Sequence, residues 1–123
     1  MDARDFVKMV INYGWQKGGY LFKDRKELNV FTHVYMNLPG DAVLFLDVFN
    51  GFLLRADNTI WNCSNLPVIH VYTFSEGDSM IAAKQLVMDR VKCVLPLFHI
   101  DDIILFHEIR DISTNKKMYC LSF

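Results

Sequence analysis

The segment from residue 99 to residue 111 is the richest in side chains that can do chemistry. Two imidazoles and four carboxylates fall within thirteen residues: His99, Asp101, Asp102, His107, Glu108 and Asp111. Such groups bind a hard metal ion, or form a general base with its orienting acid. On a strand, however, successive side chains point to opposite faces, so His107 and Glu108 diverge instead of converging on one ligand. We therefore expect a hydrogen-bonded histidine and solvated carboxylates, with no bound metal and no cofactor.

The spacing of the cysteines favours neither catalysis nor a disulfide framework. A cysteine nucleophile needs a neighbouring base, and a zinc site needs paired ligands such as C-x-x-C. Cys63, Cys93 and Cys120 show neither pattern, and their number is odd. Together with a charged N-terminus that lacks a long apolar segment behind it, this pattern predicts a reduced, cytoplasmic protein.

A strand-to-helix junction at residues 75–79 is the only other motif that could bind a ligand. Backbone N–H groups at such a junction can cradle a phosphate. Here Glu76 and Asp78 place two negative charges inside the cradle, and no G-x-x-x-x-G-K pattern follows. Helix capping explains the residue types at this junction, so we expect no catalytic residues in the chain and no enzymatic activity.

Charge placement points instead to an acidic binding face. Thirteen basic and fourteen acidic residues give a net charge of −1, which argues against direct nucleic-acid binding. Residues 41–78 contain five acidic residues and one basic one, and residues 101–111 contain four and one. Carboxylates gathered on one face would steer a basic partner. The predicted partner-binding residues are Asp41, Asp57, Glu76, Asp78, Asp101, Asp102 and Asp111.

Hydrophobic periodicity locates the elements that would carry these residues. It predicts a helix at the N-terminus and a second helix near 76–94, starting around Ser75 with Asp78 completing a capping box. Residues 42–55 fit either a helix with a narrow polar stripe or a hairpin at Asn50-Gly51, and we favour the hairpin. Alternating apolar residues predict strands, separated by turns such as 38–41, over residues 28–36, 59–63, 68–74, 102–110 and 118–123.

These elements predict a single α+β domain over residues 1–123, with a mainly antiparallel sheet of about six to eight strands. A strand around Val43 to Phe49 would be apolar on both faces, and two helices cover only one face of the sheet. The surplus apolar area predicts a homodimer or a partner protein.

From size, charge and the lack of catalytic groups we expect a non-catalytic protein-binding domain. A small cytoplasmic inhibitor or immunity-type protein that binds a basic partner, such as a toxin or a nucleic-acid enzyme, fits best. The alternatives are a small enzyme, dependent on His and Asp or on a metal, that uses residues 99–111, and an oligomeric accessory subunit.

Overall fold

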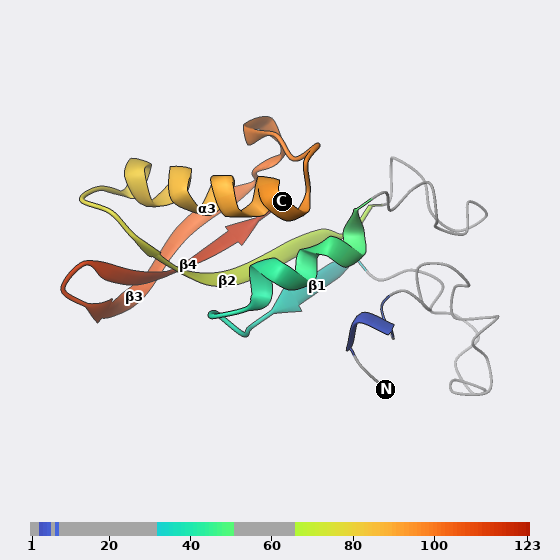
Figure 1. Ribbon diagram of the computed structural model, residues 1–123, viewed down its shortest axis with the longest axis horizontal. Coiled ribbons are helices and arrows are strands. Elements are labelled where there is room, and N and C mark those ends of the chain that lie inside the picture. The colour runs from blue at the N-terminus through green and yellow to red at the C-terminus, as the bar shows by residue number, and fades with distance from the viewer. Residues whose placement is uncertain (1–2, 6, 8–31, 51–65) are drawn as a thin grey trace. The chain divides into compact units, whose positions relative to one another are not determined.

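A computed structural model of the chain describes residues 3–5, 7, 32–50 and 66–123 (Figure 1). Two compact units make up the chain: residues 1–32 with 48–67, and residues 33–47 with 68–123. In the first unit, residues 3–5 and 7 are helical. The rest of the predicted N-terminal helix and the predicted strand at 59–63 lie outside the described residues. Within the described ranges, no helix is long and apolar enough to cross a membrane.

The second unit is built on a mixed sheet, which has four strands over the described part of the chain. These strands are β1 (His33–Met36), β2 (Val68–Glu76), β3 (Leu105–Ser113) and β4 (Lys116–Ser122). Their order across the sheet is β1-β2-β4-β3. β1 and β2 run parallel, whereas β4 is antiparallel to both β2 and β3.

The prediction of a mainly antiparallel sheet with six to eight strands is therefore wrong. That prediction joined consecutive strands by short turns, but residues 37–67 separate β1 from β2. A connection of this length can cross over the sheet and bring the next strand in parallel, which a tight turn cannot do. Alternation of apolar residues marks each strand but carries no information about its direction.

The region after β1 is helical where we favoured a hairpin. Residues 42–49 form the 3-10 helix η1 (Ala42–Phe49), in which Leu46 is buried and Leu44 is exposed. The predicted turn before it is confirmed, because the N–H groups of Asp41 and Ala42 both donate to the carbonyl of Leu38, at 2.9 and 2.8 Å. A strand apolar on both faces is thus absent from residues 42–49, and the homodimer inferred from it stays a prediction.

The helix α3 (Met80–Val94) covers one face of the sheet. It ends where the sequence predicts, but it begins later, because β2 continues through Ser75 and Glu76 by pairing with β4. Ser75 is buried, and its hydroxyl donates to the carbonyl of Ala83 at 3.0 Å, so the odd-numbered side chains of β2 lie under α3. The core between the two elements consists of Ile69, Val71, Thr73, Ala83, Val87 and Val91.

Ser79, not Ser75, caps α3. Its backbone is extended (φ −146°, ψ 164°), and its hydroxyl accepts a hydrogen bond from the N–H of Ala82 at 3.2 Å. We expect Ser79→Ala to lower the free energy of unfolding by about 1 kcal/mol, because one N–H group of the first turn loses its partner. Urea unfolding followed by circular dichroism measures this change. Ser113→Ala, at the exposed end of β3, is the control, and equal stability of the two variants would contradict the assignment of the cap.

β3 and β4 form a hairpin that completes the sheet. The ring of Phe106 stacks on that of Tyr119 with centroids 4.8 Å apart, and Phe98 meets Phe123 edge to face at 5.0 Å. The strands predicted at 102–110 and 118–123 are confirmed with shifted bounds, since residues 100–102 form the short 3-10 helix η2 (Ile100–Asp102).

Candidate binding pocket at the carboxyl ends of β1 and β2

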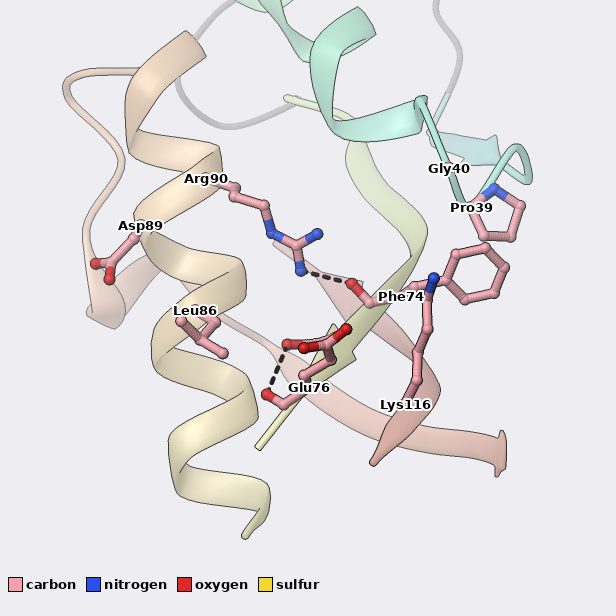
Figure 2. Close-up of a pocket in the computed structure, with 9 residues that line it drawn as sticks. Pro39, Gly40, Phe74, Glu76, Leu86, Asp89, Arg90 and Lys116 are labelled. Atoms are coloured by element: carbon pink, nitrogen blue, oxygen red, sulfur yellow. Dashed lines mark hydrogen bonds between the residues drawn. The ribbon is translucent and has the colours of Figure 1, made fainter. Parts of the chain in front are cut away.

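A pocket of about 430 Å³ lies beside the last three residues of β2 (Figure 2). β1 and β2 run in the same direction, but Met36 at the end of β1 pairs with Val71, so β2 continues for five residues beyond β1. The pocket is on the carboxyl side of both strands, the side on which open α/β sheets bind ligands. The volume lies within the range of small-molecule sites. The second unit alone supplies the lining, from the loop after β1, the ends of β2 and β4, and one face of α3.

The turn that follows β1 forms one wall of the pocket through Pro39 and Gly40. The ring of Pro39 restrains the backbone there, and the hydrogen bonds to Leu38 described above close the turn. No atom lies within 4 Å of where a Cβ on Gly40 would be, so this part of the wall is open. The wall is attached directly to the last residue of β1, and its position therefore depends on how firmly β1 is held.

An aromatic ring and two cations face this wall. The Nζ of Lys116 lies 4.9 Å from the centroid of the Phe74 ring, a cation–π contact. Arg90 reaches in from α3, and its Nη2 donates to the carbonyl of Phe74 at 2.5 Å (Figure 2). Partial burial lowers the pKa of Arg90, and the nearby charge of Glu76 opposes this shift. Arginine remains a cation despite such a shift.

One carboxylate lies beside these cations: Glu76, the last residue of β2, whose charge acts on Arg90. Asp89 borders the pocket from α3, but its side chain points away from Arg90 (Figure 2), and its Oδ1 accepts a hydrogen bond from Gln85 at 2.8 Å. The pocket thus combines an apolar ring with hydrogen-bond donors and acceptors of both charges. This combination suits a flat, polar, aromatic ligand better than a simple anion.

The predicted acidic residues fall at two ends of the sheet. Glu76 lines the pocket, Asp41 and Asp78 follow the carboxyl ends of β1 and β2, and Asp111 pairs with Lys117 at the same edge. Asp101 and Asp102 precede β3, whose first residue pairs with the last residue of β4 at the opposite end. Asp57 lies outside the described residues. A binding role for these carboxylates stays a prediction.

In the segment from 99 to 111, local capping accounts for the side chains of His99 and Asp102, and Glu108 and Asp111 both form ion pairs with Lys117. His99 caps η2, with its Nδ1 accepting from the N–H of Asp101 at 3.2 Å, while its own N–H donates to Asp102 at 2.8 Å. His107 lies opposite Cys120 and Glu108 opposite Tyr119, so these two side chains point to different faces of β3. Across the described ranges, no three of these residue types are grouped to hold a metal ion.

Most of the pocket was missed by the sequence analysis. Glu76 was singled out, but Pro39, Phe74, Arg90 and Lys116 were not. They come from four segments, which are brought together by the antiparallel pairing of β2 with β4, by α3 beside β2 and by the turn after β1. The available signal was the long connection between two apolar strands, which predicts a crossover and a ligand site at the carboxyl ends.

Comparison with known proteins shows which proteins this sequence is similar to. No family model matches the chain. A curated relative from Paramecium tetraurelia is 38% identical over 124 residues, which is 100% of this chain and 25% of the relative. One from Xenopus tropicalis is 35% identical and covers 99% of this chain and 23% of the relative. Both relatives are named tRNA (guanine(37)-N(1))-methyltransferase. The chain spans about a quarter of their length.

A solved structure with a similar fold is that of wild-type Trm5b from Pyrococcus abyssi. The TM-score is 0.51 at 18% sequence identity, and the match covers 88% of this chain and 33% of that chain. At this identity the likeness concerns the fold alone, and it extends over one third of the Pyrococcus abyssi protein.

These matches overturn the expected function. A non-catalytic inhibitor or immunity-type protein, no enzymatic activity and no nucleic-acid partner were all expected, yet the relatives are named as enzymes that act on tRNA. The expectation failed because it required a cluster of reactive side chains. Where a co-substrate carries the reactive group, the protein needs chiefly to bind and orient the two substrates, and no cluster of reactive side chains is required.

Proposed function

We propose that this chain forms the part of a tRNA (guanine-N1)-methyltransferase that contains the pocket at the carboxyl ends of β1 and β2. The observation that carries the proposal is the 38% identity to a relative of that name along the whole chain. The position of the pocket supports it, since that edge of a parallel sheet pair is where ligands bind.

The chemistry of the pocket suits a guanine base that is flipped out from between its neighbouring bases in the RNA. Enzymes that modify a base bind it between apolar or aromatic surfaces and contact its Watson–Crick edge. Phe74 and Pro39 offer such surfaces. The edge of guanine that contains N1 presents N–H donors, which a carboxylate accepts, and we assign this role to Glu76.

The two cations have a separate role in this proposal. Arg90 and Lys116 neutralise the phosphates that flank the bound base, or contact the guanine O6. A methyl-donor substrate supplies the electrophilic methyl group: the bond between N1 and the methyl carbon forms as the bond from the donor to that carbon breaks, and the N1 proton passes to the carboxylate of Glu76. The residues of this chain bind the base, orient its N1 and hold the pocket wall in place.

The experiment is a chimera of the Paramecium tetraurelia methyltransferase in which this chain replaces the matching quarter. We expect it to methylate a tRNA with guanine at position 37 and not one with adenine there, using S-adenosylmethionine as methyl donor. Glu76→Gln in the chimera should lower kcat/KM about 10- to 100-fold, the cost of a lost charge-assisted hydrogen bond. Transfer of a labelled methyl group to the tRNA measures both effects.

Glu108→Gln is the matched control, because Glu108 is a carboxylate on β3 that pairs with Lys117 and does not line the pocket. It should leave kcat/KM unchanged. A folded chimera without methylation, beside an active parent enzyme, would overturn the proposed function. An active chimera that tolerates Glu76→Gln would overturn only the role of Glu76.

A further inference from the structure

A chain of hydrogen-bonded side chains crosses three strands of the sheet, on the face of β2 opposite α3. His33 Nδ1 on β1 lies 2.9 Å from His70 Nε2 on β2, and His70 Nδ1 lies 2.7 Å from the hydroxyl of Ser122 on β4. The Tyr35 ring stacks on His70 with centroids 4.5 Å apart, and the two imidazole centroids are 5.2 Å apart. Both nitrogens of His70 are therefore engaged, one to each neighbouring strand.

The hydrogen bond between the imidazoles requires one shared proton. A neutral imidazole has one donor and one acceptor nitrogen, and an imidazolium has two donors. With both rings neutral, or with one of them protonated, an N–H can face a bare nitrogen. With both protonated, two N–H groups face each other, and two positive charges repel at the 5.2 Å separation of the rings.

The surroundings do not compensate for a second proton. On β1 the facing groups are His33 and Tyr35, and on β4 they are Ser122 and the Cys120 thiol, 3.9 Å from the Ser122 hydroxyl. On β3, the apolar Leu105 lies opposite Ser122 and His107 lies opposite Cys120, and on β2 Tyr72 follows His70 on the same face. Within residues 32–50 and 66–123, no carboxylate forms an ion pair with either imidazole. Partial burial, and next the charge of His33, lower the pKa of His70.

The position of this pair connects it to the pocket. β1 has four residues, and within the described part of the chain it pairs with β2 alone. The chain continues from Met36 directly into the turn that supplies Pro39 and Gly40 to the pocket wall. A change in how β1 is held therefore moves this wall.

We propose that His33 and His70 form a pH-sensitive connection between β1 and β2, which keeps the Pro39–Gly40 wall of the pocket in place until both imidazoles are protonated. Protonation of the second ring breaks the hydrogen bond, loosens β1 and displaces the wall. This regulation goes beyond the proposed function and holds whichever ligand the pocket takes.

The test is an NMR titration of the full chain between about pH 8 and about pH 5, the range in which histidine titrates. The ring signals of the four histidines and the backbone amide of Gly40 are followed together. We expect the Gly40 amide to shift with a midpoint below about 6.5, the ordinary value for histidine, and to coincide with the second proton of the pair. The ring signals of His99 and His107 are recorded in the same spectra as internal references.

Substitution separates this connection from a general effect of acid. His33→Gln keeps a donor and an acceptor but cannot gain a charge, so the pH dependence of the Gly40 amide should disappear. His107→Gln is the matched control and should retain it. A Gly40 amide that stays fixed while both rings titrate in the unmodified chain would overturn the proposal, and so would a dependence that persists in a folded His33→Gln variant.

The same linkage predicts a loss of stability in acid. A histidine whose pKa is lowered in the folded state favours folding when neutral, so its contribution is present above the unfolded value of about 6.5 and is lost as the pH falls below it. The urea midpoint should therefore drop more between about pH 7.5 and about pH 5.5 in the unmodified chain than in His33→Gln. Equal drops in the two proteins would contradict the connection.

Discussion

Leu121→Ala should lower the free energy of unfolding by about 2 to 5 kcal/mol, the cost of deleting a fully buried leucine side chain. Leu121 is 0% exposed on β4, the strand that lies between β2 and β3. It is paired with Val71 on one side and with Phe106 on the other. The cavity left by alanine would touch both neighbouring strands, so the surrounding side chains cannot close it by moving one element alone.

Urea unfolding monitored by tyrosine fluorescence and by circular dichroism measures this loss. Leu97→Ala makes the same chemical change at a side chain that is 93% exposed, and it should alter stability by no more than about 0.5 kcal/mol. A Leu121→Ala variant as stable as Leu97→Ala would show that β4 is not the centre of the folded core.

Gly77→Ala should have the next largest effect, about 1 to 3 kcal/mol of lost stability, because Gly77 combines backbone strain with a close approach. Its φ is +148°, a conformation that L side chains rarely adopt. A Cβ there would lie 2.9 Å from the backbone nitrogen of Ala83, which cannot move without distorting the first turn of α3. Glycine at this position lets the chain turn from the end of β2 into α3 beside the pocket.

Gly40→Ala is the matched control, because open space surrounds the position of its Cβ. It should change stability by no more than about 0.5 kcal/mol. In the chimera, Gly77→Ala should also reduce methyl transfer, since Glu76 immediately precedes the distorted residue. Normal stability of Gly77→Ala would contradict the strained turn.

Local periodicity predicted much of the second unit. The end of α3 at Val94, the strand at residues 68–74 and the turn at residues 38–41 all follow from patterns within a few residues of one another. Such patterns indicate which side chains are buried, because the buried face of a helix or strand follows from the order of residues within that element. The start of α3 was misplaced because Ser75 and Ser79 are both suitable caps, and pairing with β4 decides between them.

Strand direction and the site depended on longer distances along the chain. Nothing in the alternation of β1 and β2 distinguishes a parallel from an antiparallel pair, and the parallel direction is what brings the turn after β1 toward the carboxyl end of β2, where the pocket lies. Arg90 and Lys116 read as ordinary surface cations until the sheet brings them to one edge. The net charge of −1 then led to the wrong partner class, because it describes the whole chain and not the groups around one pocket.

The outer strand β3 pairs with β4 alone among the described strands, and it exposes Leu105, Ile109 and Ile112. A straight apolar edge of this kind would offer its free N–H and C=O groups to a strand of another molecule and would promote fibril growth. Two irregularities in its register, between Glu108 and Arg110 and between Asp111 and Ser113, break the regular spacing of those groups. β3 is therefore a poor template for cross-β stacking, and strands of other molecules should not add to the sheet at this edge despite its exposed isoleucines.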